Sequence, residues 1–562
     1  MNKKAIYLLT SILAVSVAAS SGLIYYLYRQ HQNIKHSISE LGKKLMLEED
    51  LSPQEEKEVE KIAEKIIDPW SDLQSKLKDT VVQIFSQISE FNWLEPYKTP
   101  NQGQAFGTGF FIDNKGYLIT NAHVVNQISV AYIQIPSLGK QQFEVEIVCF
   151  NPDRDLALLK LKDDELKKVK ELLGEIPFLK FGDSNKVKRG AEIMTLGFPL
   201  GQQGLKSTTG VVSGRETVNR LGQYIQIDAP INPGNSGGPS VNNRGEVIGV
   251  NAAKITDAEN IGYIIPINEL KLILKDMFNC KGSLMRRPFL GVFYNASNPV
   301  ALTEYLGNPL PGGLYITAIF EGGLMDKAGV RSGDMLYEIN GHKIDIFGDI
   351  SYFEEDKISL PDYTAYLPLD QEVSLLVYRN GKKLNVKFKF AQSEMPPVRV
   401  KYPDFEKIDY EVIGGMVVME FARNLIPLLL QTDSELIIYE DFKNQLEPFL
   451  IVTHVIPGSP INRTRVITAG TRISEVNGKP VKTLEEFRDA TQKSLETSYL
   501  TLRTMKDVFT VCNLDSIILQ EPKLASTYRY KISKFMKHLM EEYTKKHEKK
   551  TGSNSAGEAA TA

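Results

Sequence analysis

Between Thr80 and Ile267 the sequence consists of short alternating runs broken by turn residues, and this pattern constrains the fold more than any other feature. Val81-Val-Gln-Ile-Phe85 is a typical run, and Asn114-Lys-Gly116 is a typical hairpin-turn signal. The helix candidates are short, such as Asp163–Leu173. The pattern predicts an all-β domain, a sandwich or a barrel, of roughly 190 residues.

The length, charge and cysteine content bound the remaining possibilities. A chain of 562 residues suggests several domains, and its net charge of −3 gives no reason to expect nucleic-acid binding. Cys149, Cys280 and Cys512 fit no zinc spacing and no disulfide framework. We therefore expect them to be small buried residues, and we expect no metal ion or other cofactor.

The N-terminus contains a long apolar segment. Residues 5–28 carry no charge and are long enough to span a bilayer. A cleaved signal peptide is the alternative, with small residues near Ala19, but the apolar run continues beyond that point. We predict a membrane anchor over residues 1–30 and a helical stalk or linker over 31–79.

Two segments behind the all-β region resemble each other. Gly333–Ile344 and Gly470–Val481 share a glycine, a glutamate and an Asn-Gly turn at matching positions. Each reads as a strand that leads into a tight turn, which predicts two related β-rich modules. The chain then ends with a charged helical stretch, Tyr528–Lys549, and a small-residue tail that we expect to be disordered.

The stretch Asn232–Ser240, NPGNSGGPS, places Ser236 among three glycines. It matches the G-x-S-x-G nucleophile elbow of α/β-hydrolases, but that motif needs a helix after the serine, and Pro239 and Gly245 disfavour one. A serine hydroxyl is a poor nucleophile without an adjacent base. His123 is the only histidine in the all-β region, so it is the candidate base.

A catalytic histidine needs a carboxylate that holds its tautomer, and the sequence offers Asp153 and Asp155. Asp155 directly precedes the apolar run Leu156-Ala-Leu-Leu159, whereas Asp153 follows a proline and reads as a turn residue. We choose Asp155. The order His123, Asp155, Ser236 is one of three convergent triad orders.

The glycines suggest an oxyanion hole. Gly234 can turn its own N–H, together with that of Ser236, toward one point, where the two groups would stabilise a negative oxygen. Gly237 and Gly238 would then let the substrate backbone come close.

Six motifs stand in the order found in one protease family: TNAHVV, the Asn151–Lys160 segment, LGFPLG, STTGVVSG, DAPINPGNSGGPS and IGYIIPI. The sequence resembles the HtrA/Deg family of serine proteases. The resemblance implies a chymotrypsin-like double β-barrel over residues 80–275, with the active site between the barrels. It also supports Asp155, because the family's catalytic aspartate directly precedes the Leu-Ala-Leu run.

The family resemblance further implies that the repeated segments are PDZ domains, over residues 281–392 and 396–520, with the charged helix and tail at 521–562. A PDZ domain adds an extended peptide to a sheet edge and captures its C-terminal carboxylate with N–H groups. The expected donors are Leu290, Gly291 and Val292 in the first module and Gly414, Gly415 and Met416 in the second. Ordinary strand starts are the alternative, and the second module could serve packing or assembly instead.

The sequence thus predicts a mainly β, membrane-anchored and ATP-independent serine endoprotease. The expected partners are unfolded or misfolded proteins, hydrophobic C-terminal peptides at the first PDZ domain, and further copies of the chain in a trimer or larger assembly. The protease and PDZ domains would be extracytoplasmic, which means the periplasm if the organism is a bacterium. A PDZ-based chaperone or scaffold, and a processing protease with one dedicated substrate, remain as alternatives. The aromatic residues Phe91, Trp93 and Tyr97 are candidates for a trimer contact or for the core.

Overall fold

The computed structural model describes residues 70–202, 204–217, 223–254, 261–353 and 357–558. The chain divides into two compact units, Met1–Ser71 and Asp72–Ala562, and the sheets described below belong to the second. The predicted membrane span at 5–28 lies outside the described residues. Among the helices that are described, none combines the length and the apolar character needed to cross a bilayer.

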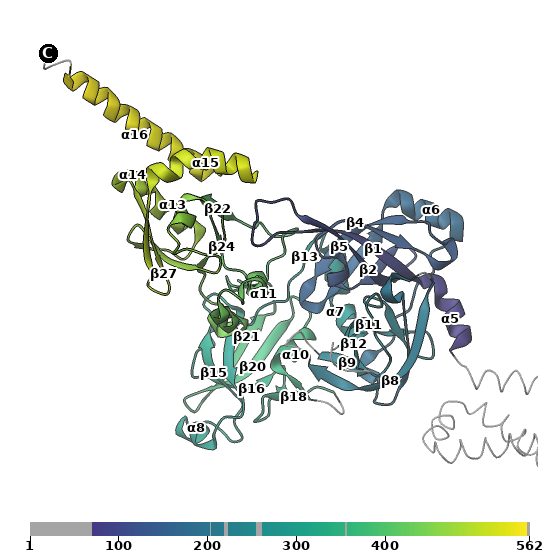
Figure 1. Cartoon of the computed structure of the whole chain (residues 1–562). Helices are drawn as coiled ribbons and strands as arrows, with labels where there is room; N and C mark the ends of the chain where they lie inside the picture. The colour runs from purple at the N-terminus through teal and green to yellow at the C-terminus, as the bar shows by residue number, and fades with distance from the viewer. Residues whose placement is uncertain (1–69, 203, 218–222, 255–260, 354–356, 559–562) are drawn as a thin grey trace, which may run out of the picture. The chain divides into compact units, whose positions relative to one another are not determined.

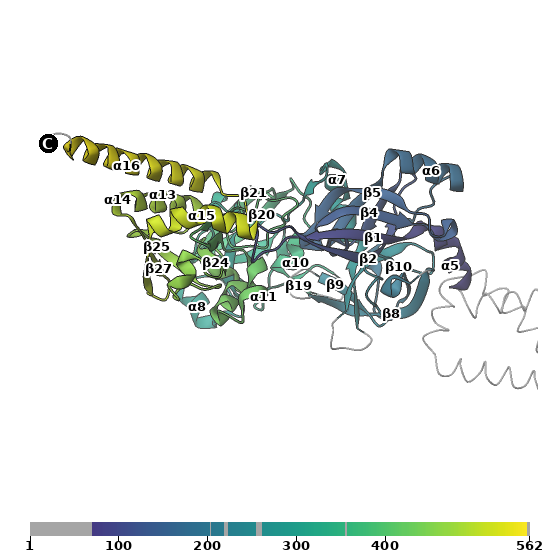
Figure 2. The same ribbon diagram turned by 45° about the horizontal axis from the view of Figure 1, so that its top comes forward.

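The first six strands close into a barrel. Their order is β5-β4-β1-β2-β3-β6, β5 also pairs with β6, and β13 joins β5 in parallel. Figure 2 shows β1, β2, β4 and β5 side by side. Alternating side chains such as Val82, Ile84 and Phe111 fill its core, as the period of two requires. The bounds are β1 (Val81–Glu90), β2 (Asn101–Phe111), β3 (Tyr117–Thr120), β4 (Ile128–Gln134), β5 (Phe143–Asn151), β6 (Leu156–Leu161) and β13 (Ser283–Leu284).

The next six strands form a second closed barrel, in the order β10-β11-β12-β9-β8-β7. Its core contains Ile193, Val212, Ile225 and Ile264. The region is therefore a double β-barrel, which confirms the all-β expectation and decides between sandwich and barrel. The bounds are β7 (Glu192–Gly197), β8 (Lys206–Thr217), β9 (Gln223–Ile227), β10 (Pro239–Val241), β11 (Val247–Lys254) and β12 (Gly262–Pro266).

Short helices connect the strands of the two barrels. Asp163–Leu173 is helical, as the sequence predicts, and a longer helix follows the second barrel. The helices are α5 (Ser71–Leu77), α6 (Asp163–Leu173) and α7 (Ile267–Asn279). The 3-10 turns are η1 (Lys78–Thr80), η2 (Ala122–Val125), η3 (Pro136–Leu138), η4 (Pro152–Arg154), η5 (Ser184–Lys186) and η6 (Pro199–Gly201).

The first C-terminal module is a sheet in the order β14-β15-β16-β20-β21, with β17 paired to β16 and a separate β18-β19 hairpin. The strands are β14 (Val292–Asn295), β15 (Leu314–Ile319), β16 (Met335–Ile339), β17 (His342–Lys343), β18 (Asp349–Ser351), β19 (Lys357–Ser359), β20 (Glu372–Arg379) and β21 (Lys382–Lys389). The helices are α8 (Val300–Tyr305), α9 (Leu324–Lys327) and α10 (Leu360–Ala365).

The second C-terminal module repeats this framework with one strand more, in the order β22-β23-β24-β25-β27-β28, with β26 paired to β25. Its strands are β22 (Tyr410–Ile413), β23 (Met416–Glu420), β24 (Leu450–Val455), β25 (Arg472–Val476), β26 (Lys479–Pro480), β27 (Tyr499–Thr504) and β28 (Phe509–Asn513). Its helices and 3-10 turns are η7 (Arg423–Leu425), α11 (Ile426–Leu429), η8 (Ser434–Glu440), η9 (Phe442–Asn444), α12 (Pro460–Arg463), α13 (Leu484–Gln492), α14 (Ser494–Thr497), α15 (Leu514–Tyr528) and α16 (Lys534–Glu558).

The repeated Asn-Gly turns have the same structural role in both modules. Asn340 and Asn477 have φ values of 50° and 49°, and the glycine after each also has a positive φ. The Asn340 side-chain oxygen accepts the N–H of Ser374 at 2.9 Å, and that of Asn477 accepts the N–H of Thr501 at 2.8 Å. Each asparagine therefore ties its turn to the start of the next long strand.

The structure supports the core alternative for the aromatic segment and corrects the expectation for the C-terminal tail. Trp93 is 8% exposed and belongs to a core cluster with Val398 and Phe421, so this aromatic segment contributes to the core of the chain itself. Helix α16 runs to Glu558, through residues that we expected to be a disordered tail (Figure 1). Once a helix is nucleated, each further residue adds a backbone hydrogen bond, and Ser and Ala do not stop it.

Candidate active site

His123 and Asp155 meet at one edge of the first barrel. His123 lies in η2, directly after β3, and Asp155 lies between η4 and β6. The imidazole Nδ1 is 2.8 Å and 3.0 Å from the two carboxylate oxygens of Asp155, and the backbone N–H of His123 donates to the same carboxylate at 3.0 Å. The Asn121 side chain donates to the Asp155 carbonyl at 2.9 Å. The carboxylate and the imidazole are thus held in a fixed relative orientation.

This geometry sets the tautomer and the basicity of the imidazole. With the Nδ1 proton donated to Asp155, the basic lone pair is on Nε2. Burial of the ring lowers the pKa of His123, but the hydrogen bond and the negative charge of Asp155 outweigh burial and raise that pKa above its usual value. The side chain of His123 remains half exposed, so Nε2 is accessible to a reacting group.

Ser236 lies in the loop between β9 and β10, and both barrels hold this loop. From the first barrel, Thr108 donates its N–H to the Ser236 carbonyl at 2.9 Å and its hydroxyl to the Gly234 carbonyl at 2.6 Å. From the second barrel, Asn251 exchanges backbone hydrogen bonds with Gly237 and Gly238, both at 2.8 Å. Sequence reasoning did not find Thr108 or Asn251, because neither stands near the motif and nothing local marks them.

The glycines around Ser236 are required by neighbouring backbone rather than by substrate. A Cβ on Gly237 would lie 2.2 Å from the Thr108 carbonyl oxygen, and one on Gly238 would lie 2.2 Å from that of Leu196. We expected Gly237 and Gly238 to admit the substrate backbone. Instead, the close approach is made by strands of the two barrels, which leave no room for a side chain.

The two expected oxyanion donors have no competing acceptor among the described residues. The N–H of Asn235 between them is bonded to the Asn232 carbonyl at 2.9 Å, whereas hydrogen bonds from the N–H groups of Gly234 and Ser236 are absent within the described part of the chain. Gly234 has a φ of 99°, and a Cβ there would meet the Phe198 carbonyl oxygen at 2.4 Å. Only glycine can hold this backbone conformation at this distance.

The Ser236 hydroxyl donates to the Ala252 carbonyl at 3.2 Å. In a Ser-His arrangement ready for attack, the hydroxyl would donate to the imidazole instead. The Ser236 hydroxyl would have to leave the Ala252 carbonyl before it could make such a bond.

The neighbouring Asp153 and Arg154 have other contacts. Asp153 accepts the backbone N–H of Arg287 at 2.7 Å, so it is bound to the segment that leaves the second barrel. Arg154 is 6% exposed and donates to the Glu269 carbonyl at 3.1 Å and to the Ala365 carbonyl in α10. Arg154 was missed by the sequence analysis, since its partners lie far along the chain.

The loop expected to bind peptides in the first module has free donors at the end of the sheet. The carbonyls of Leu290 and Gly291 accept the N–H groups of Met325 and Phe320, at 3.0 Å and 2.8 Å. The N–H groups of Leu290 and Gly291 have no acceptor in the described part of the chain. Val292 begins β14, the terminal strand of its sheet.

The corresponding prediction for the second module needs correction. Gly414 and Gly415, with φ values of 55° and 84°, form a two-residue hairpin turn, because Ile413 pairs with Met416. Strand β22 covers the edge of β23, the edge to which an extended peptide would be added. The Gly414 N–H donates to the buried carboxylate of Glu521 in α15 at 3.2 Å. These residues form a closed turn rather than an open loop of donors.

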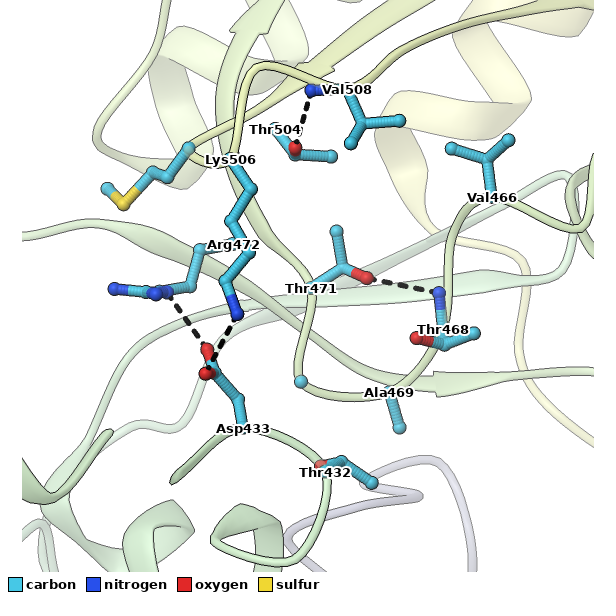
Figure 3. A pocket seen from close by; sticks show the side chains of 12 residues that line it. Thr432, Asp433, Val466, Thr468, Ala469, Thr471, Arg472, Thr504, Lys506 and Val508 are labelled. Atoms are coloured by element: carbon cyan, nitrogen blue, oxygen red, sulfur yellow. Dashed lines mark hydrogen bonds and ion pairs between the residues drawn. The ribbon is translucent and has the colours of Figure 1, made fainter. Parts of the chain in front are cut away.

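A pocket elsewhere in the second module contains none of the expected site residues. It has a volume of about 170 Å³, and Figure 3 shows the Asp433 carboxylate inside it, between Arg472 and Lys506. The distances are 3.1 Å to Arg472 Nε and 3.2 Å to Lys506 Nζ. The pocket thus presents a paired carboxylate. The described residues also contain no cluster of three His, Cys, Asp or Glu side chains arranged to hold a metal ion.

The sequence is similar to a known peptidase family and to named serine proteases. Residues 107–250 match the family model for a trypsin-like peptidase domain. A probable periplasmic serine endoprotease, DegP-like, from Marinomonas is 28% identical over 396 residues, covering 69% of this chain and 74% of the relative. The serine protease Do-like HtrA of Bacillus subtilis is 30% identical over 312 residues, covering 52% of this chain and 64% of the relative.

Solved structures give the same names. The HtrA-type protease AlgW with a decapeptide is 23% identical and covers 58% of this chain and 99% of its own, with a TM-score of 0.45. The serine endoprotease from Yersinia pestis is 20% identical, with a TM-score of 0.41. The sequence relatives are named serine proteases or serine endoproteases, and the matching family model is that of a trypsin-like peptidase domain. The chain is a homologue of the HtrA/DegP proteases and, like them, a serine endopeptidase of chymotrypsin-like fold.

Proposed function

We propose that His123, Asp155 and Ser236 are the catalytic triad of this HtrA-type endopeptidase, which cleaves unfolded or regulatory proteins and is activated when a hydrophobic C-terminal peptide binds the first C-terminal module. The observation that carries the proposal is the pairing of His123 with Asp155 at the edge of one barrel, with Ser236 held by Thr108 of that same barrel.

In the proposed mechanism, the Ser236 Oγ attacks the scissile carbonyl while His123 Nε2 takes its proton. His123 then gives this proton to the leaving amine. Asp155 keeps the Nδ1 proton in place and stabilises the imidazolium that forms. A water molecule, activated in the same way by His123, hydrolyses the acyl-enzyme.

The N–H groups of Gly234 and Ser236 would stabilise the tetrahedral oxyanion. Hydrogen-bond donors arranged in advance at this position lower the barrier by a few kcal/mol, roughly 3. Neither N–H group has an acceptor among the described residues, which leaves both available for the proposed role. The proposed attack also requires the Ser236 hydroxyl to leave the Ala252 carbonyl.

The primary specificity pocket is proposed to be apolar. Ala229 and Ile231 are buried in the segment before the nucleophile loop. The nearby carboxylate of Asp228 accepts the N–H of Val211 at 2.6 Å and so is already bound. We therefore expect cleavage after aliphatic residues rather than after lysine or arginine.

The finer organisation belongs to the same proposal. The domain bounds are 80–275 for the peptidase, 281–392 for a first PDZ domain and 396–520 for a PDZ-like module, followed by 521–562. Residues 5–28 would anchor the chain in a membrane, with an extracytoplasmic peptidase, in keeping with the relatives named periplasmic. Assembly into trimers or larger oligomers is proposed from the family resemblance alone.

The test measures degradation of a reduced, carboxymethylated protein by the full-length chain, with and without hydrophobic C-terminal peptides. We expect Ser236→Ala to reduce turnover by about four orders of magnitude, because losing the nucleophile leaves only residual catalysis. Ser213→Ala, at an exposed position in β8, is the matched control and should retain full activity.

Each other outcome identifies a rival. Equal cleavage by wild type and Ser236→Ala would mean that Ser236 is not the nucleophile. No cleavage under any condition, with client proteins still bound, would favour the chaperone or scaffold. Cleavage of one protein in a whole-proteome digest would favour a dedicated processing protease.

The pH profile tests the role of His123 separately. Only the neutral imidazole can accept the proton from Ser236, so kcat/KM should fall as the pH falls through the pKa of His123. Because Asp155 raises that pKa, the fall should be centred above the usual value of about 6.5. In Asp155→Asn the midpoint should move to lower pH, and the plateau should drop by about 10⁴-fold.

A further inference from the structure

Two of the three cysteines lie together where the chain leaves the peptidase domain. Cys149 is in β5, and Cys280 directly follows helix α7. Strand β13 comes next and pairs in parallel with β5, with Ser283 opposite Cys149. The sequence separation of the two cysteines gave no reason to expect this proximity.

A tight turn brings the Cys280 side chain against β5. The backbone N–H of Ser283 donates to the Cys280 carbonyl at 3.2 Å, and the N–H of Gly282 donates to the Val148 carbonyl at 2.6 Å. The Cys280 thiol lies 3.1 Å from the Ser283 carbonyl oxygen and 3.4 Å from its hydroxyl. Residues paired in adjacent strands point to the same face, so the Cys149 side chain lies on the face where the Cys280 thiol contacts the Ser283 hydroxyl.

The two thiols differ in exposure and in acidity. Cys149 is fully buried, and its hydrogen bond to Cys280, together with burial, raises its pKa far above the usual range. Cys280 is half-buried. Its hydrogen bonds from the Cys149 thiol and from Ser283 lower its pKa to about 6, against the opposing effect of burial. A thiolate that solvent can reach, next to a buried thiol, is the arrangement of an attacking and a resolving cysteine.

We propose that Cys149 and Cys280 form a reversible dithiol–disulfide pair. In the first step, the Cys280 thiolate attacks one sulfur of an external disulfide, forming a mixed disulfide and releasing one thiolate. In the second, Cys149 loses its proton to solvent and attacks the Cys280 sulfur, which releases the second thiolate. The two cysteines together lose two electrons and two protons, and the external disulfide is reduced to two thiols.

The disulfide would cross-link the segment where the chain leaves the peptidase domain. It joins the end of α7 to β5, and β5 leads through η4 to Asp155. The segment after β13 already contacts η4, since Arg287 donates its N–H to the Asp153 carboxylate at 2.7 Å. Oxidation would therefore restrict movement between the second barrel, the first barrel and the chain that continues into the first C-terminal module.

The experiment equilibrates the full-length chain with mixtures of reduced and oxidised glutathione, traps free thiols with a maleimide after acid quenching, and maps them by mass spectrometry. We expect Cys149 and Cys280 to become protected together, in one cross-linked peptide, while Cys512 still reacts after unfolding. The oxidised chain should also unfold at a higher temperature than the reduced chain.

Variants separate the two roles. In Cys149→Ser, Cys280 should retain glutathione as a stable mixed disulfide, and in Cys280→Ser, Cys149 should stay free. Cys512→Ser is the matched control and should behave as wild type. In a reduced Cys149→Ala chain, which lacks any donor at this position, the alkylation of Cys280 should move to higher pH than in wild type.

Three results would overturn the proposal. The first is that both thiols remain open to alkylation in fully oxidised glutathione. The second is that wild-type Cys280 accumulates glutathione while Cys149 stays reduced. The third is that the disulfide joins two chains, which a non-reducing gel would show as a dimer.

Discussion

The two C-terminal modules share a strand framework and differ at one sheet edge. In the first, β14 is the terminal strand of its sheet. In the second, the corresponding strand β23 is covered by β22, and the Gly414-Gly415 turn joins the two. The same fold therefore leaves an edge open for strand addition in one copy and closes it in the other.

A helix completes the closure in the second module. The carboxylate of Glu521 in α15 accepts the Gly414 N–H at 3.2 Å and the Tyr530 hydroxyl at 2.7 Å. Ile517 of the same helix packs in the module's core. A buried side-chain carboxylate thus occupies a backbone N–H that an open loop would offer to a peptide.

The first module is bound to the peptidase domain through α10 and the residues beside it. Tyr366 donates to the Gln223 side chain at 3.2 Å, and Thr217 donates to Asp362. The guanidinium of Arg215 lies 4.4 Å from the centroid of the Phe353 ring. The contrast indicates that the open module is coupled to β8 and β9, whereas the closed module is sealed by its own C-terminal helix.

The largest expected effect is on the closed turn. In Gly415→Ala, the new Cβ would lie 2.2 Å from the Ser459 Cβ, at a φ of 84°. Left-handed strain and overpacking together should lower the free energy of unfolding of this module by about 2–5 kcal/mol. Gly478→Ala is the control, because its φ is 75° but nothing lies within 4 Å, so it should cost only about 1 kcal/mol. Urea unfolding measures the free energy of unfolding of both variants. Equal losses of stability would contradict the tight packing of the Gly414-Gly415 turn.

The next effect is a pH dependence in the second module. Burial raises the pKa of Glu521 to about 7, although hydrogen bonds from Tyr530 and Gly414 oppose the rise. The unfolded carboxyl titrates near 4.3, so stability should fall as the pH rises from about 4 to 7, by roughly 4 kcal/mol in total. Glu521→Gln should remove this slope and stabilise the module at pH 8.

Denaturant unfolding at pH 5 and pH 8 measures the slope, with the exposed Glu485→Gln as a matched control. A Glu521→Gln chain that is less stable than wild type at pH 8 would show that the ionised carboxylate is the stabilising form.

A smaller effect tests the open edge. Gly291→Ala places a Cβ 3.1 Å from the Gly323 Cα at a φ of 76°, which should displace the free N–H groups of the loop. Binding of a hydrophobic C-terminal peptide should weaken at least tenfold, or about 1.4 kcal/mol. Fluorescence anisotropy measures it, with an amidated peptide to remove the carboxylate and Gly341→Ala as the control variant. Unchanged affinity would move the peptide site away from this loop.

The smallest effect concerns the contact with the peptidase domain. Tyr366→Phe removes the hydroxyl that donates to Gln223 and leaves a buried acceptor without its donor, at a cost of about 1 kcal/mol. The useful readout is the stimulation of cleavage by peptide, which should decrease while peptide affinity stays constant. A change in affinity without a change in stimulation would argue against coupling through α10.

Local patterns predicted the parts of this molecule that local chemistry determines. Alternation and turn residues indicated the barrels, the Asn-Gly repeat indicated two related modules, and the setting of Ser236 led to His123 and Asp155. The backbone fixes the position of Asp155, because its left-handed conformation, with a φ of 50°, ends η4 directly before β6.

Long-range packing determined the rest, and the sequence carries no local signal for it. Gly414-Gly415 looked like a peptide loop because an additional strand and a distant glutamate are invisible from the turn itself. Thr108, Arg154 and the contact of Cys149 with Cys280 depend likewise on partners more than a hundred residues away. A sequence motif determines its local backbone conformation, whereas the complete fold determines which distant residues pack against it.

The position of Thr108 has a consequence for the stage of synthesis and folding at which the site is completed. Its hydrogen bonds to Gly234 and Ser236 join strand β2 of the first barrel, which also holds the proposed base, to the loop that carries the proposed nucleophile. During synthesis the first barrel emerges with His123 and Asp155 long before Ser236 leaves the ribosome. A partly synthesised chain would thus hold the proposed base without the proposed nucleophile. Under the proposed mechanism, proteolytic activity would begin only once the second barrel packs against the first, so an incomplete chain could not cleave other unfinished copies.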